Sequence, residues 1–211
     1  MAYLYTWPER LADGTVHLLG IAVSITATVL LIVYAARTGT GPDVAAVSIY
    51  GGVAIFAFTA SAAYHMTPWN RARPWLQRVD HAAIYLKIAG TYTPLVVVLG
   101  SVFAYFVLGV VWTVAVLGAV GKLTQLLRPG WASTLLYIIM GWASLVLIWP
   151  LGQTVPTASL WLMVAGGVVY TLGAPINHWN SLRFNTAIWH CFVLAGYVLF
   201  FAAIVLALTA T

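Results

Sequence analysis

Four polar side chains in this sequence have types and positions suited to metal chemistry. Ser61 and His65 are four residues apart, so they share one face of a helix. Asp80 opens another apolar stretch, and His190 lies about one turn inside the last one. Neutral imidazoles are good zinc ligands, and zinc activates water as a nucleophile. The pattern favours zinc on His65 and His190. Asp80 would act as general base, and Ser61 would orient the site.

Each of these side chains also has an ordinary structural interpretation. Asp80 could cap the helix that begins near it, and Ser61 could donate to a carbonyl of its own helix. His81 and His178 are typical of hydrogen-bonded packing residues near an interface. The sequence leaves these alternatives open, so the elements that position the residues must be considered next.

The composition places these residues in a membrane protein. Of the 211 residues, 63% are hydrophobic and 6% are charged, whereas an ordinary globular domain carries about 25% charged residues. So few charges cannot cover a soluble surface, which excludes a water-soluble enzyme. The basic residues are too few and too scattered to track phosphates, so we expect no nucleic-acid partner.

Seven stretches have the length of about 20 mostly apolar residues that a bilayer-spanning helix needs. They are 18–36, 44–64, 82–99, 102–121, 132–150, 158–176 and 186–209. Helices satisfy their own backbone hydrogen bonds in lipid, and these runs are too long for barrel strands. We therefore predict an all-α integral membrane protein, with one seven-helix domain over residues 1–211. A capping-box pattern predicts a short interfacial helix at residues 7–12.

The loop charges predict the orientation of the bundle. Loops on the N-terminal side contain seven cations, namely Arg10, Arg71, Arg73, Arg78, Lys122, Arg128 and Arg183. The opposite loops contain only Arg37. This asymmetry predicts a multi-pass protein of the cell membrane with a cytoplasmic N-terminus and an external C-terminus. All five histidines fall on the N-terminal side, so we expect any site in the cytoplasmic half.

Four short motifs, spread along the whole chain, indicate a resemblance to a known protein family. They are Glu9-x-x-x-Asp13-x-x-x-His17, SAAYH at 61–65, DHAAIYLKIAGTYTP at 80–94 and AIWHCFVLAG at 187–196. Together they resemble the haemolysin III family, the bacterial branch of the progestin and adiponectin receptor (PAQR) superfamily. The first motif is similar to a family opening that has asparagine at the position of Asp13.

The resemblance implies seven helices and a zinc site near the cytoplasmic face. In this family, one zinc ligand comes from a Ser-x-x-x-His motif, and His65 matches it. Two more come from a His-x-x-x-His motif on the last span, where His190 matches the second position. Thr186 stands at the first position, so one imidazole is missing. His17 and His178 are the histidines that could replace it, and the sequence does not choose between them.

Lys87 is the charged exception within the seven apolar stretches. A charged side chain at the bilayer centre costs about 3 kcal/mol on insertion scales. We expect Lys87 to reach a carboxylate, a carbonyl or water inside the bundle. A second hypothesis is that it partly replaces the positive charge of a weakened metal site.

The resemblance also implies a function. It suggests a zinc-dependent intramembrane hydrolase whose substrate is a membrane lipid with an amide bond, such as a ceramide-like molecule. The alternative is a non-catalytic protein with a degenerate metal site, either receptor-like or a membrane-homeostasis or haemolysin-type protein. An ion-coupled transporter is disfavoured, because the ionisable residues gather on one side of the predicted membrane domain.

Overall fold

The computed structural model describes residues 6–210, and it contains seven helical segments of membrane-spanning length. They are α1 (Trp7–Thr38), α2 (Gly41–Met66), α3 (Arg73–Leu99), α4 (Val102–Leu123), the segment Trp131–Gly152, α7 (Thr157–Asn177) and α8 (Asn185–Thr209). No strand occurs between residues 6 and 210. The predicted all-α fold with seven apolar helices is therefore confirmed.

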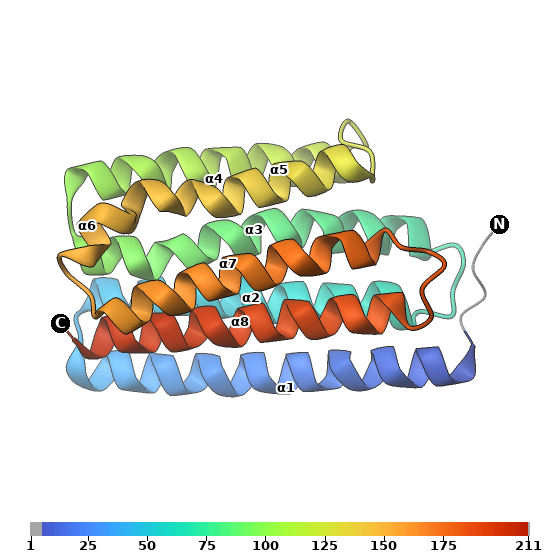
Figure 1. Cartoon of the computed structure of the whole chain (residues 1–211), viewed down its shortest axis with the longest axis horizontal. Helices are drawn as coiled ribbons and strands as arrows, with labels where there is room; N and C mark the ends of the chain where they lie inside the picture. Colours follow the sequence, from blue (N-terminus) through green and yellow to red (C-terminus); the bar gives the residue numbers. More distant parts are fainter. Residues whose placement is uncertain (1–5, 211) are drawn as a thin grey trace.

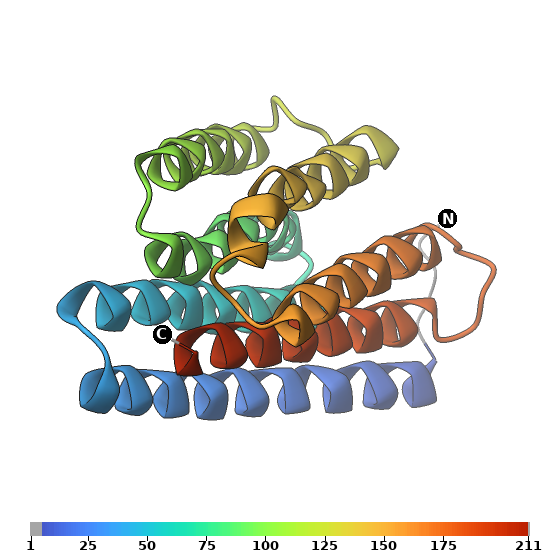
Figure 2. The ribbon, with the colours of Figure 1, turned by 60° about the vertical axis from the view of Figure 1, so that its left-hand side comes forward.

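The helices lie along one long axis (Figure 1). The first helix, α1, packs against α2 and α8, whereas α3 packs against α2 and α4, and α7 packs against α8. Figure 2 shows α4 and α5 on the side of the bundle away from α1. Because α5 packs more sparsely, mainly against α3 and α7, the bundle is less tightly filled between these helices.

The first helix begins directly after Thr6. The backbone N–H and the hydroxyl of Thr6 donate to one carboxylate oxygen of Glu9, at 2.8 and 2.7 Å. This capping box and a proline in the first turn start the helix. Residues 7–12, expected as a separate interfacial helix, are the first turns of α1, because no proline or cap interrupts the helix before Thr38.

The fifth segment differs from the continuous helix expected at 132–150. It consists of α5 (Trp131–Trp142), a 3₁₀ turn called η1 (Ala143–Leu147) and α6 (Ile148–Gly152). The Tyr92 hydroxyl donates to the carbonyls of Met140 and Gly141, at 2.7 and 3.1 Å. An uninterrupted α-helix would use these carbonyls for its own ladder. Farther along, Pro150 lacks the N–H that would donate to the carbonyl of Val146. The regular helix α5 therefore stops at Trp142.

Two glycines allow neighbouring spans to pack closely. A Cβ on Gly90 would lie 2.2 Å from Cγ2 of Val53, and a Cβ on Gly196 would lie 2.7 Å from Cε2 of Tyr170. The missing side chains let α2 approach α3, and α7 approach α8. The contact at Gly196 also fixes the ring of Tyr170 beside a cavity described below.

The cations gather at the end of the bundle where α1 begins. The loops between α2 and α3, between α4 and α5, and between α7 and α8 lie at this end (Figure 1). Three of the seven cations counted above lie in these loops, namely Arg71, Arg128 and Arg183, and the other four lie in the adjoining helix ends. Arg37 lies near the end of α1 at the opposite side. The cytoplasmic position of the cationic end stays a prediction.

Candidate metal centre

Three histidines from three helices converge toward the cationic end of the bundle. They are His17 of α1, His65 of α2 and His190 of α8. The ring centroids lie 4.3 Å apart for His17 and His190, and 4.7 Å apart for His65 and His190. The rings of His17 and His65 are 5.5 Å apart. The structure thus brings together the two histidines expected as ligands, and it adds His17.

The Asp13 carboxylate lies among these rings. One oxygen is 2.6 Å from Nδ1 of His190. The other is 3.6 Å from Nε2 of His17 and 3.8 Å from Nδ1 of His65. The Asp13 side chain is only 3% exposed, so a single buried carboxylate faces three imidazoles.

A row of buried polar residues on α1 positions this centre. Glu9, Asp13 and His17 are spaced by four residues, and all three are buried. Glu9 also accepts the backbone N–H of Phe184, at 3.1 Å. Phe184 adopts a left-handed conformation, with φ of 60°, directly before α8. Glu9 therefore ties the beginning of α8, and with it His190, to the first turn of α1.

Ser61 and Asp80 lie beside the histidines, as expected from their motifs. The Ser61 hydroxyl oxygen is 3.4 Å from Nε2 of His190. Asp80 is 8% exposed and interacts electrostatically with Ser61, Asp13 and His17. It does not open its helix, because α3 already begins at Arg73. The capping interpretation of Asp80 is therefore wrong, and its buried carboxylate faces the site.

Thr186 is buried one turn before His190 and borders the same space. Its hydroxyl donates to the side-chain oxygen of Asn185, at 3.3 Å. Threonine is a poor zinc ligand, so the position expected to hold a histidine contributes no imidazole. His17 instead brings a third imidazole to the cluster from the neighbouring helix α1.

His178 makes different contacts. Its ring stacks on Trp131, with centroids 4.2 Å apart, and its Nε2 lies 2.8 Å from the Thr134 hydroxyl oxygen. Partial burial lowers the pKa of His178, because the charged ring would lose hydration. These contacts join the ends of α7 and α5, so His178 lies outside the three-imidazole cluster.

The donor atoms of the cluster fit a zinc-type cation. Asp13, His17 and His65 each offer one ligand atom, and these atoms lie within 4.8 Å of one another. Tetrahedral zinc, with ligand distances of about 2.0–2.2 Å, separates its ligand atoms by about 3.4 Å. The contacts of Asp13 with His17 and His65 are close to this separation. Among the residues described, Nε2 of His17 is buried without a hydrogen-bond partner, and a bound cation would satisfy it.

Asp13 and His17 belong to the first of the four motifs, and the resemblance assigns Asp13 no role in the site. Their four-residue spacing from Glu9 is the signal that could have revealed a polar helix face. A sequence does not show which way this face turns, so only the packing of α1 against α2 and α8 reveals the convergence.

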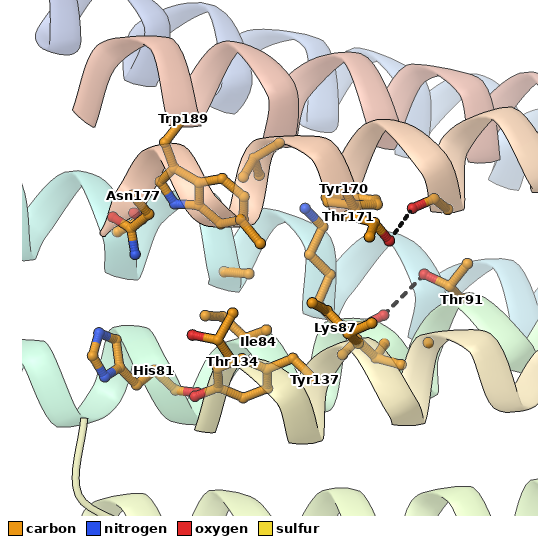
Figure 3. Close-up of a pocket in the computed structure, with 18 of the residues that line it drawn as sticks. His81, Ile84, Lys87, Thr91, Thr134, Tyr137, Tyr170, Thr171, Asn177 and Trp189 are labelled. Atoms are coloured by element: carbon orange, nitrogen blue, oxygen red, sulfur yellow. Dashed lines mark hydrogen bonds between the residues drawn. The ribbon is translucent and has the colours of Figure 1, made fainter. Parts of the chain in front are cut away.

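A cavity of about 680 Å³ extends from the cluster between α3, α5, α7 and α8. Figure 3 shows Lys87 of α3 reaching across it toward Tyr170 and Thr171 of α7. Most of its lining is apolar or aromatic, and its volume lies within the range of about 300–1,000 Å³ typical of small-molecule pockets. The cavity therefore joins the polar cluster to a mostly apolar space of the size that small molecules occupy.

Comparison with known proteins identifies the family. A family model described as "Haemolysin-III related" matches residues 5–201. The chain belongs to this haemolysin III-related family. Hemolysin-3 of Bacillus cereus is 38% identical over 194 residues, which cover 92% of this chain and 89% of that protein. The Hemolysin-3 homolog of Bacillus subtilis (strain 168) is 34% identical over 194 residues, covering 92% and 91%. The haemolysin III resemblance of the four motifs is thereby confirmed.

Proposed function

We propose that this haemolysin III-related protein is a zinc-dependent intramembrane hydrolase of a lipid amide bond. The observation that carries the proposal is the convergence of three imidazoles on Asp13 at the wall of a cavity between membrane-spanning helices. Histidine and carboxylate donors suit a zinc centre with an open position for water. The choice of an amide bond comes from the resemblance to the PAQR superfamily.

Asp13, His17 and His65 would hold the ion, because their donor atoms have suitable separations. His190 would then orient the Asp13 carboxylate through their 2.6 Å contact. The motif alone places His190 in the ligand set together with His65. The zinc affinities of His17→Ala and His190→Ala distinguish the ligand set Asp13, His17 and His65 from the set His65 and His190. Loss of a ligand is expected to weaken zinc binding more than loss of an orienting residue.

A bound zinc ion would supply a Lewis acid that lowers the pKa of water toward about 7. Asp80 is the general base in this proposal, because its buried carboxylate faces the cluster from α3. Ser61 lies next to both Asp80 and His190 and would position the reacting groups by hydrogen bonding. The cavity would hold the acyl chain and keep bulk water away from it.

The experiment is hydrolysis of ceramide by the purified, zinc-loaded full chain, measured as released fatty acid. Asp80→Asn should reduce the rate by about a hundredfold or more, because it removes the general base while keeping the side-chain shape. Asp43→Asn is the matched control, since Asp43 lies at the start of α2 and bonds to Thr40 at the opposite end of the bundle. Equal rates for the wild type and Asp80→Asn would refute the assignment.

A second candidate function is a non-catalytic, haemolysin-type or receptor-like membrane protein. Thr186 favours it, because the last span supplies one imidazole fewer than the family motif. The two relatives are named hemolysins, and a haemolytic factor would permeabilise membranes without any lipid amide. Dye release from liposomes of phosphatidylcholine alone, reconstituted with the pure chain, would favour this function over the hydrolase.

A further inference from the structure

Lys87 occupies an unusual place for an ammonium group. It lies in the middle of α3, about 21 Å from Arg73 and about 18 Å from Leu99 along the helix axis. Both helix ends lie near the ends of the bundle, so Lys87 is close to the centre of the membrane-spanning region. Its side chain borders the cavity (Figure 3), so the ammonium group faces the space that a ligand would enter.

The contacts of the ammonium group are aromatic. Nζ of Lys87 lies 4.5 Å from the ring centroid of Phe58, 5.3 Å from that of Tyr170 and 5.6 Å from that of Tyr197. These rings come from α2, α7 and α8. Within residues 6–210, no oxygen atom forms a hydrogen bond or an ion pair with this Nζ. The rings stabilise the charge through cation–π contacts but do not neutralise it.

Among residues 6–210, no carboxylate is free to pair with Lys87 at this depth. The four acidic residues of the chain are Glu9, Asp13, Asp43 and Asp80. The first two belong to the buried row on α1, and Asp43 bonds to Thr40 at the other end of the bundle. Asp80 lies about 10 Å from Lys87 along α3, beside the metal centre. An anion that neutralises Lys87 must therefore enter the cavity from outside the chain.

We propose that Lys87 is an anion subsite of the cavity, and that it binds the carboxylate of a single-chain lipid. The subsite borders the same cavity as the metal centre, and the Lys87 charge also acts on His190. A fatty acid is the product of the proposed hydrolysis, so the inference rests on that function and deepens it, although binding at Lys87 does not itself require zinc. The aromatic rings hold the ammonium in place, and the apolar lining of the cavity takes the hydrocarbon chain.

The surroundings of Lys87 select a group with one negative charge. In the part of the chain that the structure describes, Lys87 is the one lysine that lines the cavity, and no arginine does. The nearby Thr91 hydroxyl donates to the Lys87 carbonyl, and the Thr171 hydroxyl donates to the Gly167 carbonyl, so neither hydrogen is available to an anion. A phosphomonoester with two charges would remain half-neutralised in an apolar cavity, which is unfavourable. A carboxylate needs only the one cation that is present.

The test is equilibrium binding of oleate to the purified full chain in detergent, with oleyl alcohol as the uncharged analogue of the same chain length. Lys87→Met keeps a long apolar side chain but removes the charge. It should weaken oleate binding by about tenfold or more and change oleyl alcohol binding by less than about twofold. Lys87→Arg should retain oleate binding, because it keeps the charge.

Two further comparisons separate this subsite from the metal centre and from other anionic lipids. Removing metal with a chelator should leave oleate affinity unchanged, and loss of binding after chelation would place the carboxylate on the metal instead. Equal oleate affinity of the wild type and Lys87→Met would overturn the subsite. Tighter, Lys87-dependent binding of oleoyl lysophosphatidylglycerol would overturn the carboxylate assignment in favour of a phosphodiester headgroup.

Discussion

Asp13 and His190 are separated by 177 positions in the chain, yet Oδ1 of Asp13 lies 2.6 Å from Nδ1 of His190. The contact joins the first helix to the last, and both partners are buried. A buried carboxylate is costly unless charged or hydrogen-bonding partners surround it. Asp13 has three imidazoles as such partners, so α1, α2 and α8 are joined through one carboxylate.

Replacing Asp13 by asparagine tests the charge of this centre. Asp13→Asn keeps the size of the side chain but removes an anionic ligand, so zinc affinity should fall by at least about tenfold. Titration calorimetry of the metal-free protein with zinc measures it. Asp43→Asn should leave the affinity unchanged, because Asp43 lies at the far end of α2. An equal loss of zinc affinity in Asp13→Asn and Asp43→Asn would indicate general destabilisation instead of loss of a ligand.

Thr186 and Asp13 both depart from the motifs that the haemolysin III resemblance implies, and we expect the departures to compensate one another. Thr186→His adds an imidazole one turn before His190, on a buried position that borders the site. In the Asp13→Asn background, it should recover at least about half of the lost zinc binding free energy. The zinc affinities of the wild type, both single variants and the double variant provide the comparison. If the effects of Asp13→Asn and Thr186→His on the zinc binding free energy simply added in the double variant, the two positions would not compensate one another.

Tyr92 should be important for the broken fifth span. Tyr92→Phe removes the hydroxyl that bonds to Met140 and Gly141, which leaves exposed helix carbonyls in an apolar region. We expect a loss of about 1–3 kcal/mol in unfolding free energy, measured by denaturation in detergent. Tyr105→Phe is the control, because Tyr105 is 46% exposed on α4. An equal effect of both variants would contradict a role for the hydroxyl.

The contact of α7 with α8 depends on a missing side chain. Gly196→Ala would place a Cβ 2.7 Å from Cε2 of Tyr170, so the helices or the ring must move. We expect destabilisation by about 1–3 kcal/mol in thermal or chemical unfolding. A Cβ on Gly109 of α4 meets nothing within 4 Å, so Gly109→Ala should be neutral or slightly stabilising. If Gly196→Ala had the same unfolding free energy as the wild type, the close contact between Gly196 and Tyr170 would not be important for stability.

The orientation predicted from the loop charges can be measured in intact cells. The exposed native cysteine is first replaced by Cys191→Ser. Thr154→Cys, in the loop after α6, should then react with a membrane-impermeant maleimide, whereas Asn180→Cys, in the loop after α7, should react only after lysis. Both positions are exposed. The reverse labelling pattern would place the cationic end outside the cell.

Hydropathy was sufficient to predict the seven segments, because a bilayer requires long apolar helices. It missed the break after Trp142, since that break depends on Tyr92, which lies 48 residues before Met140 in the chain. The Ser61–His65 spacing and the motifs around Asp80 and His190 identified residues that do lie together. A sequence does not specify how each helix is rotated.

The same limitation explains the third imidazole and the surroundings of Lys87. His17 was one of two candidates to replace the missing histidine, and only helix packing separates it from His178. For Lys87, the sequence predicted a carboxylate, carbonyl or water as partner. The structure instead places three aromatic rings around it, from helices that are distant in the chain. The position of His17 and the surroundings of Lys87 both depend on contacts between helices rather than on the sequence pattern within one helix.

Crystals of the zinc-loaded full chain, measured at the zinc absorption edge, would test the metal centre most directly. We predict that the strongest anomalous-difference peak lies among Asp13, His17 and His65, with His190 still in contact with Asp13. A map from zinc-loaded crystals with well-ordered side chains but no peak among these residues would contradict it.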